Sequence, residues 1–450
     1  MPALSTPLTP VQSSTVAKAV ETHNARKLLY ELCQNYYDGQ QNVKMTARLR
    51  KILAQQGYFR SNFCGLVIDT MIDRLEVTGF RTENDDLSEW MWNIWKASRF
   101  DEEQVITHTQ AAIKGDSYCI VDWDQELAQP RMNYNDAKAC SIFYHEADRK
   151  SPRVALKTWA IEEGQRVNLY WPDRVEKYIT SKHGGGWTGW LDEGDTGWPI
   201  PWPIGRIPVF HFRNRPAGGA YGQSEIANIV PLQDALNKSL IDLFQSMDST
   251  GFPTRWVTGA TKPASGWKFA IGDVWHFTDL GARTGIYDPP NLHPMIEAID
   301  KIVDLIAAIS RTPAHIFKLG GTPPSGEALK TSEAGLVAKV IRRQTVFGNT
   351  YEDVMRHCIL QQGKFGKGSR FDSTTAIDTL WASAETRSRL ADAQVTQILA
   401  PIISEEEALR INGYTGEEIT TIKDEKAANK AAGLNLGEAL LASFERGGAQ

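Results

Sequence analysis

The chain has 450 residues, of which 42% are apolar and 23% charged, a composition typical of a globular protein with a sizeable core and more than one substructure. Its formal net charge of −5 argues against a protein that binds nucleic acid through many phosphate contacts, because such binding needs clustered Lys and Arg. The sequence contains no apolar run of about 18 residues and no secretion-type leader, so we expect no membrane association. Five cysteines, odd in number and never spaced as CxxC, predict reduced, buried thiols.

The first quarter of the chain is predicted to be mainly helical. Residues 1–23 are rich in Pro, Ser and Thr and predict a flexible N-terminal arm, whereas residues 24–57 show a helical pattern interrupted near "YYDGQQN". Residues 63–80 run from a helical pattern into a strand. Residues 87–114 predict two helices, the second ended by Gly115.

The hydrophobic pattern changes from a helical to a β-type period between residues 117 and 213, which predicts a sheet there. Short β-rich segments, several of them alternating between apolar and polar residues, are separated there by turn sequences. The segments are "SYCIVDWD", "RVALKTWAI", "RVNLYW", "RVEKYITS" and "IPVFHFRN". This spacing predicts a mainly antiparallel sheet.

The pattern returns to helix after residue 223. Apolar residues three and four apart predict one helix near residues 231–250 and a second at 292–310, with a compact β-rich insert between them. The chain therefore leaves on one helix and returns on the other. A long helix is predicted from about 326 to 362, with Gly335 and Gly348 as candidate bends, and capping boxes predict short helices near the end.

The stretch "GGTPPSGEALK" at residues 320–330 has the glycine spacing of a phosphate-binding loop without its chemistry. A P-loop carries Lys and then Ser or Thr after its last glycine, where this chain has Glu327 and Ala328. A carboxylate would repel phosphate there, and the two prolines remove backbone N–H donors. We therefore predict a Gly/Pro loop at a helix start, with Ser325 as the N-cap residue.

No other motif predicts catalysis. "GGGWTGW" at residues 184–190 fits GxGxxG, but the sequence after it cannot form the helix that a dinucleotide site requires. "DWDQE" at residues 122–126 begins like a calcium loop, yet Leu127 and Asn133 occupy the positions of its glycine and closing glutamate. His315 is predicted to be a packed or surface histidine rather than a base. We expect no enzymatic activity, no cofactor and no metal.

Four tryptophans in one Gly/Pro-rich stretch allow two interpretations. If exposed, they would suit a glycan-binding platform; the favoured interpretation is that they bury large ring areas between irregular β connections. These residues are Trp187, Trp190, Trp198 and Trp202.

Three carboxylates share one side of the predicted helix at residues 292–310. Glu297, Asp300 and Asp304 are spaced three and four apart, which places like charges next to one another. A solvated helix face is one interpretation. The alternative is an acidic strip that faces a polyanion and keeps it from sticking.

The order of these segments resembles the portal proteins of tailed bacteriophages, specifically the siphovirus-type family. The resemblance rests on six blocks that span nearly the whole chain, at residues 62–80, 111–124, 207–242, 251–259, 311–355 and 404–418. It implies an α+β, portal-like fold. Such a fold has an α/β wing, a two-helix stem, a small β-rich clip, a long kinked helix with a tunnel loop, and a short helical crown.

The resemblance also implies a role for each region. After the arm come the wing (24–222), stem helix 1 (223–250), the clip (251–290), stem helix 2 (291–312), the tunnel loop (313–326), the long kinked helix with its return to the wing (327–384) and the crown (385–450). The DNA-facing residues of the tunnel loop are expected to be Lys318, Thr322, Pro323 and Ser325. The expected channel strip is Glu297, Asp300 and Asp304, and the expected clip contacts are Arg255, Lys262 and Lys268.

By this resemblance, copies of the chain form a ring, usually of twelve, through which duplex DNA passes during packaging and ejection. A net acidic chain suits such a conduit, because each neutralised phosphate adds affinity and hinders sliding. The expected partners are other copies of the chain, double-stranded DNA, the major capsid protein and scaffold, the terminase large subunit, and the head-to-tail connector or adaptor. The expected location is the capsid portal vertex of the virion, after assembly in the host cytoplasm.

Overall fold

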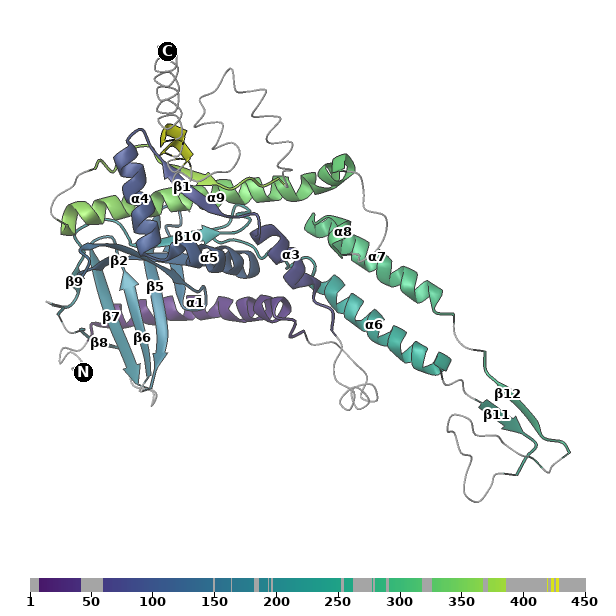
Figure 1. Ribbon diagram of the computed structural model, residues 1–450. Helices are drawn as coiled ribbons and strands as arrows, with labels where there is room; N and C mark the ends of the chain where they lie inside the picture. Colours follow the sequence, from purple (N-terminus) through teal and green to yellow (C-terminus); the bar gives the residue numbers. More distant parts are fainter. Residues whose placement is uncertain are drawn as a thin grey trace, which may run out of the picture. The chain divides into compact units, whose positions relative to one another are not determined.

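The computed structural model describes residues 8–41, 60–148, 150–162, 164–181, 186–192, 194–195, 197–251, 255–261, 277, 280–288, 291–317, 326–366, 371–385, 419, 422–424 and 426–428 (Figure 1). The chain divides into two compact units of mixed helix and strand. Unit 1 is Met1–Lys27, Asp69–Ser224 and Pro323–Gln450, and unit 2 is Leu28–Ile68 and Glu225–Thr322. Within the described part, no helix combines the length and apolarity needed to cross a membrane.

Unit 1 contains the antiparallel sheets that the β-rich segments predict. β2 (Asp116–Asp124) lies between β3 (Gln129–Asn135) and β10 (Val209–Arg213) in a three-stranded sheet. A six-stranded sheet has the order β4 (Cys140–Tyr144), β5 (Pro152–Ile161), β6 (Gly164–Tyr170), β7 (Arg174–Ser181) and β8 (Thr188–Gly189), with β9 (Ile200–Pro201) also paired to β7. Every pairing in both sheets is antiparallel, so this prediction is confirmed.

Helix α1 (Pro10–Tyr37) packs its N-terminal half on one face of the six-stranded sheet. Val16 and Val20 are buried in one apolar cluster with alternate residues of the strands, Val154, Leu156, Val167, Leu169 and Tyr178. The prediction of a flexible arm over residues 1–23 is therefore wrong from Pro10 onward. Burial of the two valines against the sheet outweighs the loose composition of the segment.

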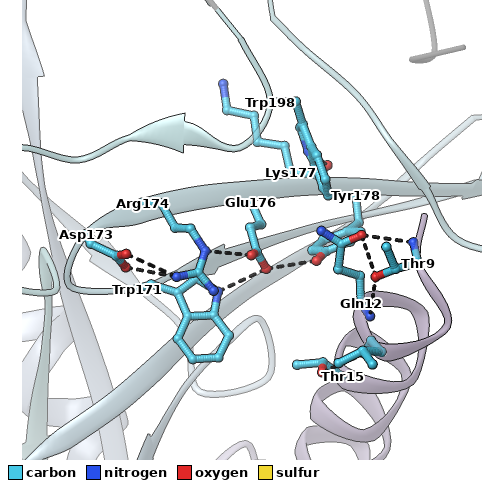
Figure 2. Close-up of polar contacts among 11 residues, drawn as sticks. Thr9, Gln12, Thr15, Trp171, Asp173, Arg174, Glu176, Lys177, Tyr178 and Trp198 are labelled. Atoms are coloured by element: carbon cyan, nitrogen blue, oxygen red, sulfur yellow. Dashed lines mark hydrogen bonds and ion pairs between the residues drawn. The ribbon is translucent and has the colours of Figure 1, made fainter. Parts of the chain in front are cut away.

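A local signal fixes the start of α1. The Gln12 N–H donates to Thr9 Oγ1 at 3.3 Å, and the Thr9 N–H donates to Gln12 Oε1 at 2.9 Å (Figure 2). This reciprocal pair is a capping box, and Pro10 stands at the first helical position, where its missing N–H costs nothing. The residues "TPVQ" therefore encode the helix start.

Beside this helix start, a buried carboxylate orders the edge of the same cluster. Glu176 accepts hydrogen bonds from Arg174 Nε at 2.8 Å, Trp171 Nε1 at 3.0 Å and the Tyr178 hydroxyl at 2.8 Å (Figure 2). Burial and the neighbouring carboxylate raise the pKa of Tyr178 well above its usual range, so its hydroxyl stays protonated and donates. Trp198 packs edge-on against Tyr178 with ring centroids 5.6 Å apart.

The remaining elements of unit 1 surround its longest helix. α4 (Asp85–Ala97) and α5 (Phe100–Lys114) are the two predicted helices, and Gly115 ends α5 in the left-handed conformation, with φ 91°. α9 (Gly326–Phe365) has 40 residues, which gives about 60 Å of helix. Its aromatic residues pack among rings from α4, α5 and β10, namely Trp95, Phe100 and Phe212 around Phe347 and Tyr351.

α3 (Phe63–Ile72) leads to β1 (Val77–Arg81), as the sequence predicts. β1 pairs with β13 (Asp378–Trp381), a strand that the sequence does not predict. The pairing joins residues 300 positions apart, so local pattern carries no signal for it.

Unit 1 buries two histidines that are uncharged in the folded protein. His108 donates from Nδ1 to the Leu75 carbonyl at 3.1 Å and accepts at Nε2 from the Tyr351 hydroxyl at 2.8 Å, and burial lowers its pKa to about 3. His23 is held between the Lys138 carbonyl and the Ser141 hydroxyl, and burial lowers its pKa to about 4. Both imidazole rings are therefore uncharged in the folded protein at neutral pH.

We expect the free energy of unfolding to fall as the pH drops below about 6.5, the ordinary histidine pKa. Both folded pKa values lie below the unfolded one, so the contribution is complete above pH 6.5 and is lost as protons bind the unfolded chain first. Each histidine contributes a slope of about 1.4 kcal/mol per pH unit in that window. Urea titrations at pH 7.5 and 5.0 measure this, and His108→Gln should flatten the slope; equal midpoints at the two pH values would contradict it.

Unit 2 contains a helical hairpin with a small two-stranded sheet at its turn. α6 (Val230–Gly251) packs against α7 (His293–Ser310), and between them β11 (Arg255–Thr258) pairs antiparallel with β12 (Arg283–Ile286) (Figure 1). The short helix α8 (Ala314–Phe317) follows α7. These bounds agree with the out-and-back helices and the β-rich insert that the sequence predicts.

Candidate functional site

The first half of α6 is fixed by buried amides. Asn237 accepts at Oδ1 from the Ser61 N–H and hydroxyl, both at 2.9 Å, and donates from Nδ2 to Gln41 Oε1 at 2.7 Å. One turn earlier, Gln233 accepts the Phe63 N–H at 2.9 Å. Because buried amides are costly when unpaired, this network holds α6 in one rotational setting.

The C-terminal end of α1 joins the same network. The Tyr36 hydroxyl donates to Asp234 Oδ1 at 2.7 Å. Burial, and to a lesser extent the Asp234 carboxylate, raise the pKa of Tyr36 above its usual range. Sequence reasoning missed all of these positions. Polar residues within an apolar helix pattern are the only signal, and they do not identify their partners.

One side of α7 is buried within unit 2, and another side is exposed to solvent. Val303, Ile306 and Ala307 are buried. Glu297 and Asp300 are exposed and Asp304 is half-buried, on a different side of the helix. The structure thus brings the three predicted carboxylates into one strip, here called the acidic strip. His293 lies 3.6 Å from Glu297 at the outer end of the strip.

The hairpin β11–β12 carries one of the three residues expected to make clip contacts. Arg255 is exposed on β11 opposite Ile286. Trp256 lies across Gly285, where an added Cβ would come within 2.6 Å of the indole ring, so any larger residue there would displace the ring. Lys262 and Lys268 lie outside the described residues.

The expected tunnel-loop residues Lys318, Thr322, Pro323 and Ser325 also lie outside the described residues. The structure describes what flanks them. α8 ends at Phe317, whose ring packs edge-on against Phe63 with centroids 5.3 Å apart, and α9 begins at Gly326. His315 on α8 is exposed, in agreement with its interpretation as a surface residue.

The calcium-like motif and the tryptophan-rich stretch both have structural roles. Asp124 Oδ1 accepts the N–H groups of Glu126 and Leu127 at 3.0 and 2.9 Å, so "DWDQE" ends a strand and forms a hairpin turn. Among the described residues, no three potential metal ligands gather. Trp190 is buried beneath Arg166, whose guanidinium lies 3.9 Å from the ring centroid. This packing favours the structural interpretation of the tryptophan-rich stretch.

The segment "GGAYGQ" at residues 218–223 folds back onto the end of α5 and forms a buried junction in unit 1. Asp116 is fully buried and accepts from Arg26 Nη2 at 2.6 Å, His211 Nε2 at 2.7 Å and the Gly222 N–H at 2.8 Å. Asn214 donates its N–H to the Gly115 carbonyl at 2.8 Å. The junction orders the chain immediately before it leaves unit 1 at Ser224.

Charge balance explains why this junction can be buried. Burial alone would raise the pKa of Asp116, but the hydrogen bonds from His211 and the Gly222 N–H, together with the charge of Arg26, outweigh it and hold that pKa below its usual range. Burial lowers the pKa of His211, which accepts at Nδ1 from the Tyr144 hydroxyl at 2.8 Å. Arg26 stacks on Tyr221, 3.6 Å from the ring centroid. One carboxylate and one guanidinium thus neutralise each other.

Comparison with known proteins identifies the class to which this architecture belongs. The profile of the family described as "Phage portal protein, SPP1 Gp6-like" matches residues 17–432. The chain belongs to that family, so the resemblance drawn from the sequence is confirmed.

Two relatives, each described as "Portal protein", come from Mycobacterium phage D29 and Mycobacterium phage L5. Each is 24% identical to this chain, and each match covers 89% of this chain and 86% of the relative. Among solved structures, a chain from the neck of an empty GTA particle has 10% identity and a TM-score of 0.45, covering 80% of this chain and 92% of that one. A chain from the virion of a native gene transfer agent particle has the same identity and TM-score, with coverage of 82% and 99%.

Proposed function

We propose that copies of this chain close head-to-tail into a ring, usually of twelve, at one capsid vertex, and that duplex DNA passes through the ring during packaging and ejection. Membership of the phage portal family supports this proposal. The observation that carries it is the α6–α7 hairpin, whose α7 presents the acidic strip to solvent beside a face buried in its own unit. A wall of such hairpins repels phosphate and lets a duplex slide.

The regions of the family architecture follow from this assignment. α6 and α7 form the stem, β11 and β12 belong to the clip, and most of unit 1 forms the wing. Residues 313–326, which begin with the short helix α8, contain the tunnel loop that approaches DNA, and residues 385–450 form the crown. The acidic strip is therefore an electrostatic surface toward DNA rather than an ordinary solvated face.

The proposed partners fit a structural protein without catalytic work. The clip, with Arg255, Lys262 and Lys268, docks the terminase large subunit during packaging and the head-to-tail connector afterwards. The major capsid protein and scaffold contact the outer regions of the ring. Motors and nucleases act on the DNA, while this chain supplies the passage and the platform.

Reversing the charge of the acidic strip should make duplex DNA bind tightly to a surface along which it otherwise slides. In the double variant Glu297→Lys/Asp300→Lys, each subunit gains four units of positive charge, so we expect at least about tenfold tighter binding of duplex DNA at low salt and a steeper salt dependence. Fluorescence anisotropy with a short duplex measures this.

The matched control for the acidic strip is Glu89→Lys/Glu126→Lys. Both side chains are exposed in unit 1, and the change in net charge is the same. This control should bind DNA as weakly as the parent chain. Equal gains for the two double variants would show that net charge alone acts, which would contradict the role of the strip.

A further inference from the structure

Unit 2 exposes an apolar stripe near the end of α1. Leu28, Leu29 and Leu32 are 78%, 53% and 46% exposed. Leu28 and Leu29 lie four and three residues before Leu32, which makes both of them its neighbours on one side of the helix. The opposite side carries the buried Tyr30 and Cys33. Three solvent-exposed leucines on about one helical turn form an apolar patch, and such patches mark contact sites for other molecules.

A second apolar stripe lies on α7. Ala298, Ile302, Leu305 and Ile309 recur at spacings of four, three and four; Leu305 is 42% and Ile309 50% exposed. This stripe is distinct from the buried side at Val303, Ile306 and Ala307 and from the acidic strip. α7 therefore has one apolar side for its own chain and another that its own chain leaves exposed.

We propose that the two stripes are the two halves of one contact between copies: Leu28, Leu29 and Leu32 of one subunit pack on the α7 stripe of the next. This rests on the ring proposed above. A closed ring needs a heterologous contact, in which two different patches of the same chain meet. Unit 2 carries both patches, with α6 contacting α1 through Tyr36 and packing against α7.

Charge at the edges of the stripes is complementary. Glu31 is exposed beside the α1 stripe, and Lys301 is exposed beside the α7 stripe, on the side toward the acidic strip. Rows of residues three and four apart on two helices fit ridge into groove. In this arrangement the acidic strip borders the contact and stays free to face the bore.

Disulfide trapping tests the pairing in the full chain. Leu28→Cys or Leu32→Cys is combined with Leu305→Cys or Ile309→Cys and oxidised in air with a copper catalyst. The five native cysteines are buried and should not react. Variants that carry only one of the introduced cysteines serve as controls. At least one pair should yield a ladder of covalent oligomers up to the size of the ring, whereas single variants should give none.

The other outcomes separate the pairing from the ring. Rings in micrographs without a cross-link from any of the four pairs would overturn the pairing and leave the ring standing. Covalent dimers from a single α1 cysteine would show that two α1 stripes meet each other, and a cross-linked monomer would show that both stripes belong to one chain's interior; each overturns the pairing. Absence of any ring would overturn the proposed function as well.

A second measurement uses charge instead of cysteine. Leu28→Asp should shift the assembly to single subunits that keep the far-ultraviolet circular dichroism of the parent chain, because the leucine packs only between copies. Val11→Asp is the matched control, since Val11 is 75% exposed on the same helix but outside the stripe. Intact rings for Leu28→Asp, or equal loss of rings for both variants, would overturn the proposal.

Discussion

Replacing Gly222 with alanine is expected to destabilise unit 1 by about 4 kcal/mol, the range in which single substitutions unfold marginal proteins. A Cβ at this position would lie 2.0 Å from the Gly115 carbonyl oxygen and 2.5 Å from the Asn214 carbonyl oxygen. Both obstacles are backbone atoms, so no side-chain rotation relieves the clash. The folded chain would have to open the junction and lose the Gly222 N–H bond to Asp116.

Urea denaturation of purified protein measures the Gly222 effect, with Gly219→Ala as the control. Gly219 lies in the same segment, but its added Cβ would come no closer than 3.7 Å to Tyr221, an ordinary van der Waals distance. The Gly219 variant should keep nearly the parent midpoint. Equal midpoints for the Gly219 and Gly222 variants would show that the close packing of residues 115 and 222 is not needed for folding.

Asp116→Ala is the second substitution with a large expected effect, about 3–5 kcal/mol of lost stability. It leaves Arg26 partly buried without its carboxylate and removes the acceptor from His211 and from the Gly222 N–H. Removing one partner of a buried pair costs more than the pair contributes, because the remaining charge stays desolvated.

The control for Asp116→Ala is Asp173→Ala, which removes an exposed carboxylate 3.1 Å from Arg174 and should cost at most about 1 kcal/mol. The folded pKa of Asp116 is depressed, so its contribution is present above the unfolded pKa of about 4 and disappears as the pH falls through the folded value. The Asp116 variant should therefore approach the parent chain in stability under strong acid. A constant difference from pH 7 down to pH 2 would contradict the ionic role.

Hydrophobic period and turn chemistry predict the regular elements of this chain well. The leucines of α6, the isoleucines of α7 and the α5 stop at Gly115 all lie as expected, because each rests on contacts within a few residues. α1 starts earlier than composition alone predicts, because the capping box "TPVQ" and the burial of Val16 and Val20 outweigh the Pro/Ser/Thr content of the segment.

Long-range features could not be predicted from local pattern. The pairing of β1 with β13, the approach of Gly222 to Gly115, and the amides that join Ser61 to Asn237 each connect segments more than 100 residues apart. For the candidate site, spacing predicted the acidic strip, because a helix fixes which residues share a side. Spacing within one helix carries no signal for what the strip faces.

Electron microscopy of negatively stained, purified protein, viewed down the symmetry axis, shows whether copies of the chain close into a ring. We expect class averages of a closed ring of identical subunits around a central opening wide enough for a DNA duplex. Single globular particles at high protein concentration, or rings whose centre is filled by protein, would contradict it.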